Sequence, residues 1–178
     1  VVLPPRRFHA EPVMEKAQAA GVAMFAMYPK RQNHHIAAWA NSELYLAMEE
    51  ARLPLALEIG QVNYGEVYDL ARAHPRMPIV LWNIGYTDER LLIPILDLCP
   101  NVHAGLATRF IPTDGIEQFT KRYGPGRLIF GRGWPAQSPG PLLTYVTYAD
   151  VPDDAKAAIL AGNIRALLAG VRWKVQGL

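Results

Sequence analysis

The sequence predicts an α/β fold with a parallel sheet, of the (β/α)8-barrel type, and three observations support this. Short apolar runs alternate strictly with amphipathic segments of helical spacing along the chain. The runs are continuously apolar, as expected for strands of a parallel sheet that is covered on its faces. A doubly wound sheet shows the same alternation, but no Gly-x-Gly-x-x-Gly follows any run, so its dinucleotide-binding form has no support.

Six apolar runs are the expected strands. In chain order they are residues 1–3, 22–27, 55–59, 79–82, 102–106 and 128–130. The first run stands at the very start of a chain that has no initiator Met, and a natural domain rarely begins inside its own sheet. The chain therefore looks truncated, and an open six-stranded array would leave two sheet edges exposed.

About six helices are expected between and after these strands. Residues 43–52 carry one apolar stripe at helical spacing, and Val67 begins the next stripe. Thr87 is expected to cap a helix that begins with Asp88. Pro94 lies inside that helical pattern and should kink the helix or delay its start.

The last third of the chain predicts two further helices. Asp114 and Glu117 have capping-box spacing before the first of them. A Pro/Gly-rich loop, residues 135–141, is then expected to lead directly to a final helix over residues 155–168. No linker divides the chain, so residues 1–178 are interpreted as a single, partial barrel domain.

Composition restricts the classes of partner. Of the 178 residues, 51% are hydrophobic and 19% charged, and the net charge of +2 argues against nucleic acid or an anionic membrane surface. No apolar stretch approaches the roughly 20 residues that a membrane-spanning helix needs. A single cysteine, Cys99, cannot form an internal disulfide, so we expect a reducing, cytoplasmic compartment and a packing role for this thiol.

Polar residues follow the expected strands, where barrels of this type place their functional side chains. In chain order these residues are Tyr28, Glu58, Asn83, Thr108 with Arg109, and Arg132 with Trp134, and His34 and His35 lie in the loop after Tyr28.

Two interpretations are open for the residues nearest to chemistry. Glu58 is either a general base or a structural carboxylate paired with Arg109 or Arg132. Asn83 either polarises a substrate carbonyl or ties down a loop. The two arginines, which follow the last two strands, either grip a phosphate or carboxylate or are solvated surface groups.

The remaining candidates are predicted to contribute to substrate binding at most. Tyr28 stands at a strand end, and His34 shares its loop with His35, although adjacent side chains need not converge and a surface role is the simpler expectation. Trp134 either covers the mouth of the barrel or packs as a lid or core residue.

Three strand ends carry the segments LPLALEIG (53–60), IVLWNIG (79–85) and RLIFGRGWP (127–135), and the final helix has Gly162-Asn163 before Leu167-Leu168. These strand ends resemble the amidohydrolase superfamily, and within it the TIM-barrel group of metal-dependent hydrolases and decarboxylases. The final helix is similar to that group's closing GN-x-x-x-LL helix. The resemblance implies a TIM barrel of which this chain covers about the last six βα units.

The metal-ligand positions depart from the family. It usually has His where Glu58 and Asn83 stand and Asp where Gly133 stands, and these bind a divalent ion, usually zinc or manganese, that makes hydroxide from water. Gly133 has no side chain, Asn83 offers a neutral amide, and Glu58 alone cannot form a three-ligand catalytic site. We therefore expect no metal cofactor.

Two classes of function follow from the resemblance and its departures. The first is a metal-independent hydrolase or lyase for a small carboxylated or cyclic substrate, with Glu58 as base, Asn83 as polar anchor and Arg132 as anion clamp. The second is a catalytically inactive relative that binds a small ligand or a protein partner. In both, the missing βα units are expected from another part of the original protein or from a neighbouring copy, which includes a homo-oligomer.

Overall fold

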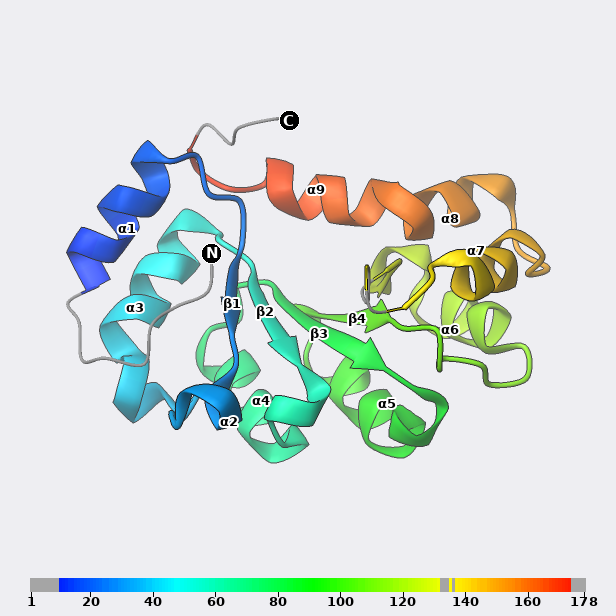
Figure 1. Ribbon diagram of the computed structural model, residues 1–178, viewed down its shortest axis with the longest axis horizontal. Helices are drawn as coiled ribbons and strands as arrows, with labels where there is room; N and C mark the ends of the chain where they lie inside the picture. The colour runs from blue at the N-terminus through cyan, green and yellow to red at the C-terminus, as the bar shows by residue number, and fades with distance from the viewer. Residues whose placement is uncertain (1–9, 132–134, 136, 174–178) are drawn as a thin grey trace.

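The computed structural model describes residues 10–131, 135 and 137–173 (Figure 1). At its centre, the five strands of the described chain form a parallel sheet in the order β1-β2-β3-β4-β5. Chain order and sheet order are therefore the same, as in the wall of a (β/α)8 barrel, whereas a doubly wound sheet reverses direction at its switch point. The strands are β1 (Phe25–Met27), β2 (Leu55–Glu58), β3 (Ile79–Ile84), β4 (Val102–Leu106) and β5 (Leu128–Ile129).

Five of the six predicted strands are confirmed, and the sixth, at residues 1–3, lies outside the described residues. The α-helices are α1 (Ala10–Ala19), α2 (Pro29–Gln32), α3 (Ala38–Ala51), α4 (Tyr64–Ala73), α5 (Glu89–Leu98), α6 (Gly115–Tyr123), α7 (Gly140–Thr147), α8 (Asp153–Ala157) and α9 (Asn163–Ala169). Short turns of other helix types are η1 (Ile59–Gln61), η2 (Tyr86–Asp88), η3 (Pro125–Arg127) and the π-type η4 (Ala158–Gly162).

The main core lies between the outer face of the sheet and the helices that follow its strands. Outward-facing strand residues such as Leu57 and Leu81 pack there with Met48 of α3, Leu70 of α4 and Leu96 of α5. Cys99 is buried in the same cluster, and burial raises the pKa of its thiol, which confirms the predicted packing role.

The other face of the sheet forms a smaller apolar cluster of Ala56, Val80, Trp82 and Ile129. Ile164 and Leu167 of α9 pack against this cluster. The rod formed by α8, η4 and α9 accordingly lies on the opposite side of the sheet from α4 and α5 (Figure 1). This face corresponds to the interior of a barrel.

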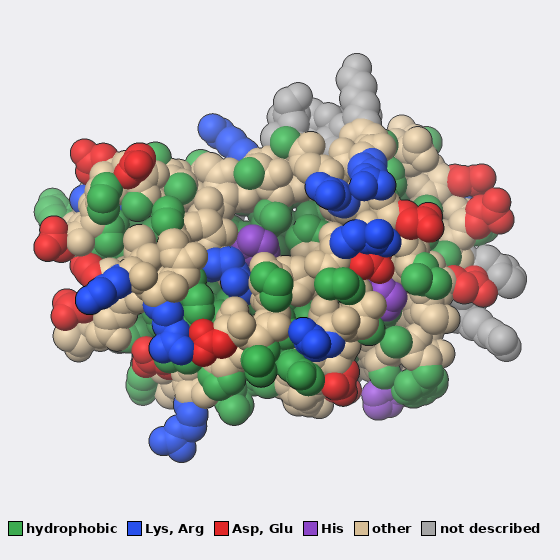
Figure 2. Space-filling view, turned by 180° about the vertical axis from the view of Figure 1, so that it is seen from behind, with side chains coloured by type: hydrophobic (Ala, Val, Ile, Leu, Met, Phe, Trp, Pro, Cys, Tyr) green, Lys and Arg blue, Asp and Glu red, His purple; other side chains and the backbone are tan. Residues whose placement is uncertain are grey.

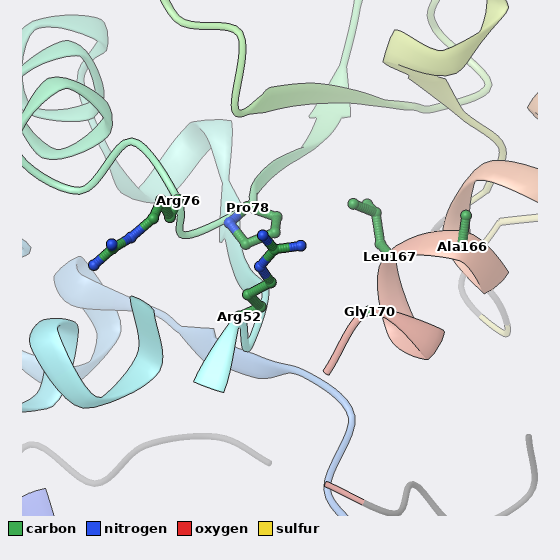
Figure 3. A pocket seen from close by; sticks show the side chains of 6 residues that line it. All are labelled: Arg52, Arg76, Pro78, Ala166, Leu167 and Gly170. Carbon is green, nitrogen blue, oxygen red and sulfur yellow. The ribbon is translucent and has the colours of Figure 1, made fainter. Parts of the chain in front are cut away.

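A pocket of about 250 Å³ lies at the end of the sheet where the strands begin. Arg52 and Pro78, which precede β2 and β3, line it together with Arg76, and Leu167 of α9 forms the opposite wall (Figure 3). In Figure 3 the Arg52 side chain projects into the gap, whereas the Arg76 side chain points away from α9. The pocket is thus at the far end of the strands from the residues predicted to carry chemistry.

Two predicted helix caps are wrong. Before α5, the Asp88 carboxylate accepts a hydrogen bond from the backbone N–H of Gly85 (2.8 Å), which stabilises the η2 turn. The N-cap residue of α5 is Asp88 and not Thr87. At α6, Asp114 has a left-handed backbone (φ 51°) and makes no side-chain cap. The Gly115 N–H instead donates to the Tyr145 hydroxyl (3.0 Å), while Glu117 accepts the N–H of Asp150 (2.7 Å).

The boundaries of several helices also differ from the prediction. The helix expected over 43–52 begins at Ala38 and contains a kink at Asn41, and α5 begins at Glu89 and continues through Pro94 without a delayed start. An additional helix, α7, begins at Gly140, within the expected loop. Pro141 is compatible with this helix because it lies in the first turn, where a backbone N–H has no partner within the helix.

The final helix contains a π-type turn that the sequence pattern did not predict. Within it the Ile159 carbonyl accepts the backbone N–H of Phe130 (2.9 Å), directly after β5. Asn163 donates to the carbonyls of Pro125 and Leu128 (2.7 Å each), so the closing helix is bonded to both ends of the last strand.

Charged side chains are dispersed over the surface. In the space-filling view, side chains of both signs are visible and neither sign covers the whole face (Figure 2). Among the described residues, no helix is long and apolar enough to cross a membrane.

Candidate functional site

The structure brings Glu58 and Asn83 together at the carboxyl ends of two adjacent strands. Glu58 ends β2 and Asn83 is the fifth residue of β3. The Asn83 Nδ2 donates to the Glu58 Oε1 across 3.3 Å, and both side chains are half-buried. This contact joins two of the predicted candidates directly through their side chains.

A β-bulge makes this contact possible. Side chains alternate along a strand, so Asn83 would share the helix-covered face of Ile79 and Leu81 if β3 were regular. The register between β3 and β4 instead shifts between Leu81 and Ile84, and Asn83 has a left-handed backbone with φ 65°. The extra residue turns Asn83 toward the strand end, where Glu58 lies.

Arg109 holds the backbone of that bulge. Its Nε and Nη2 donate to the Asn83 carbonyl at 3.2 and 2.8 Å, and Nη2 also lies 3.4 Å from the Asp88 Oδ2. The Arg109 side chain is about half exposed (49%), whereas the Asp88 side chain is 17% exposed. Arg109 is therefore paired with Asp88 and not, as one interpretation had it, with Glu58.

Tyr64 adds a buried hydroxyl close to this cluster. Its Oη is buried, and it has no hydrogen-bond partner within the described part of the chain. Burial raises the pKa of Tyr64, and the nearby Asp88 charge raises it further while the Arg109 charge opposes it. The phenol therefore stays protonated near the Arg109–Asp88 pair at neutral pH.

The loop after β1 is held by its own contacts. The Arg31 guanidinium lies over the Tyr28 ring, 5.6 Å from its centroid. His34 Nε2 is 2.8 Å from the Asn41 Oδ1, and because an amide oxygen can only accept, this nitrogen is the donor. His35 is instead near Glu66 (4.0 Å), so the two histidines contact different partners.

Asn41 holds the backbone of this loop through hydrogen bonds. It is buried at the kink of α3 and donates to the carbonyls of His35 and Ala37 at 2.7 and 3.3 Å. His34 is thus bonded to a residue that fixes its loop. An isolated Asn inside a helical pattern was the available sequence signal, because it is a poor helix former with a side chain that bonds nearby backbone.

The structure describes only part of the loops that follow β4 and β5 at the carboxyl end of the sheet. Thr108, after β4, donates to the Gln137 Oε1 (2.9 Å) and so connects its loop to the one that follows β5. Arg132, Gly133 and Trp134 lie outside the described residues, so their predicted roles stay predictions.

The described side chains do not fit the divalent ion that the resemblance implies. Within residues 10–131, 135 and 137–173, no three His, Cys, Asp or Glu side chains lie close enough to hold a metal ion. The Asn83 amide also directs an N–H, not an oxygen, at the Glu58 carboxylate. A catalytic zinc site needs three protein ligands, and this pair supplies one carboxylate.

Comparison with known proteins identifies the family. An amidohydrolase family model matches residues 1–169. No curated protein sequence is significantly similar to the chain. Three solved structures share its fold, with sequence identities of 13–17%.

The first of these structures is an uncharacterised TIM-barrel protein from Bordetella bronchiseptica, with a TM-score of 0.73 and 17% identity over 95% of this chain and 66% of the other. The second is an amidohydrolase II, with a TM-score of 0.64 and 13% identity over 93% and 69%. The third is the 5-carboxyvanillate decarboxylase of Sphingomonas paucimobilis, with a TM-score of 0.66 and 14% identity over 94% and 65%. The chain thus spans about two thirds of the length of the proteins that it matches.

Proposed function

The chain belongs to the amidohydrolase family, and we propose that it is a metal-independent hydrolase or lyase for small carboxylated or cyclic substrates. The observation that carries this proposal is the Glu58–Asn83 pair, a carboxylate and an amide 3.3 Å apart at the carboxyl ends of neighbouring parallel strands. In a (β/α)8 barrel this is the end at which active sites are built.

Glu58 is proposed as the general base. With a cyclic ester, its carboxylate takes a proton from a water molecule while the water oxygen bonds to the carbonyl carbon. Asn83 donates an N–H to the oxygen on which negative charge develops, and such a donor contributes most in a site that excludes water. The ring C–O bond then breaks, and the Glu58 carboxylic acid returns the proton to the departing alkoxide.

A carboxylated substrate is favoured by one of the neighbours in fold. The 5-carboxyvanillate decarboxylase acts on an aromatic carboxylate, and we extend this substrate class to the present chain as a proposal. Arg132 is proposed as the clamp for the substrate carboxylate, and Trp134 and Tyr28 as apolar walls. A guanidinium matches a carboxylate with two parallel N–H groups, which is the reason for choosing Arg132.

We propose that the residues at the carboxyl ends of the strands function in a barrel that is closed by further βα units. Its sheet has unpaired edges at β1 and β5 among the described strands, and parallel sheet edges need cover. These units are proposed to come from a longer protein or from a neighbouring copy, in a reducing, cytoplasmic compartment. Assays should therefore use the full-length protein.

A turnover screen tests the proposal. Full-length protein is incubated with γ-butyrolactone, dihydrocoumarin and 5-carboxyvanillate in the presence of EDTA, and products are followed by proton NMR. We expect turnover of at least one probe at a rate that EDTA does not change. Binding of a probe without turnover would instead favour the catalytically inactive relative, and turnover that EDTA abolishes would contradict metal independence.

A further inference from the structure

Asn83 has a backbone conformation that its residue type and its position do not favour. Four non-glycine residues of the described chain have positive φ, and Asn83 is the one that lies within a strand. Asparagine tolerates the left-handed region better than most residues, but a strand offers no local hydrogen bond that stabilises it there. Another part of the molecule must therefore hold this conformation.

Arg109 supplies the stabilising contact. Two of its N–H groups meet the Asn83 carbonyl oxygen, at 3.2 Å from Nε and 2.8 Å from Nη2. A charged donor makes a stronger hydrogen bond than a neutral one, and the planar guanidinium fixes its direction. The carbonyl of the bulge is thus fixed from the neighbouring β4 side of the sheet.

Gly85 and Asp88 determine the path of the Arg109 side chain. A Cβ atom at Gly85 would lie 2.9 Å from the Arg109 Cγ and Nε, so glycine is what allows the side chain to pass. Asp88 accepts both the Gly85 N–H (2.8 Å) and the Arg109 Nη2 (3.4 Å). The Tyr86 N–H donates to the Arg109 carbonyl (3.2 Å), so the two strand ends are bonded in both directions.

We infer that Arg109 is a positioning residue, which holds the bulge of β3 so that the Asn83 amide reaches the Glu58 carboxylate. This inference rests on the proposed function for its catalytic consequence, but its geometric content is independent of any activity. It differs from the substrate-anion role considered from the sequence, because it assigns the Nε and Nη2 groups of Arg109 to contacts within the protein.

The test is nuclear magnetic resonance of the Asn83 side-chain amide in ¹⁵N-labelled full-length protein. The signal is assigned by its loss in Asn83→Asp, and Glu58→Gln identifies the shift that follows when the charged carboxylate acceptor is replaced by a neutral amide oxygen, which makes a weaker hydrogen bond. The test variants are Arg109→Gln, which removes the guanidinium and its two N–H contacts, and Arg109→Lys, which keeps the charge but has a single ammonium group as donor. Gly85→Ala displaces Arg109 without removing it.

The matched control is Arg122→Gln. Like Arg109, Arg122 donates through both Nε and Nη2, in its case to the Asp97 carboxylate, and its side chain is 53% exposed against 49% for Arg109. It bridges α5 and α6, away from the strand ends. Its loss should affect stability as much as the loss of Arg109, without reaching the Glu58–Asn83 pair.

We expect Arg109→Gln and Gly85→Ala to move the Asn83 amide signal in the direction seen in Glu58→Gln, Arg109→Lys to move it less, and Arg122→Gln to leave it in place. On a probe that is turned over, Arg109→Gln should lower kcat about 10- to 100-fold with little change in KM, because misplacement by about 1 Å has effects of this size. An unmoved Asn83 signal in Arg109→Gln, or in Glu58→Gln, would overturn the inference. An Arg109 effect on the signal combined with wild-type turnover in Glu58→Gln would leave the inference standing and refute the proposed function.

Discussion

Replacing Glu58 with glutamine should lower kcat about 10²- to 10⁴-fold, the range that a positioned general base contributes. Glutamine has nearly the same shape, and its amide oxygen still accepts the hydrogen bond that the Asn83 Nδ2 donates across 3.3 Å. It cannot take a proton from water at neutral pH, so binding of the substrate should persist while turnover is lost. The rate and KM are measured on the probe that the full-length protein turns over.

Glu50→Gln is the matched control for this variant. Glu50 lies on α3 and is exposed, so the substitution makes the same change of charge at a distance from the strand ends. Its kcat should equal that of the wild type. If Glu58→Gln is as active as Glu50→Gln, the Glu58 carboxylate has only a structural role.

Replacing Gly105 with alanine should destabilise the fold by about 1–3 kcal/mol, the usual effect of overpacking a filled interior. Gly105 lies on β4 beneath the Trp82 indole, in the part of the sheet that faces the barrel interior. A Cβ atom there would be 2.8 Å from the Trp82 Cδ2 and Cζ3, and closer still to Cε3. Trp82 is 9% exposed and pairs in register with Glu58, so it has little room to move.

Thermal unfolding measures this effect. A change of 1 kcal/mol corresponds to roughly 2–4 °C in Tm for a domain of this size. Gly126→Ala is the control, because no heavy atom lies within 4 Å of a Cβ built there. Equal Tm values for the two variants would show that Trp82 does not lie over Gly105 as described.

The fold was predictable because its signals are local. Continuous apolar runs mark β2, β3 and β4 to within two residues, since strands that are covered on their faces contain few polar residues. The capping box expected at Asp114 was wrong for the opposite reason. Side chains from other segments, such as the Tyr145 hydroxyl at Gly115, compete for the same backbone N–H groups, and sequence spacing cannot show them.

The sequence could predict which residues form the candidate site but not how their side chains are arranged. Glu58 and Asn83 stand at the carboxyl ends of adjacent strands, so their proximity at one end of the sheet could be expected. Their contact depends on the bulge in β3, and a one-residue shift changes the face that every later side chain occupies. The role of Asp88 was missed because this residue does not stand at a strand end and acts through Arg109.

Metal content per chain tests the central claim most directly. Full-length protein is expressed with added zinc and manganese, purified, and analysed by mass spectrometry for bound metal. A metal-independent Glu58–Asn83 site predicts less than about a tenth of an equivalent, since one carboxylate and one amide do not make a three-ligand site. A value close to one equivalent would contradict the account and return hydrolysis by metal-bound hydroxide as the leading mechanism.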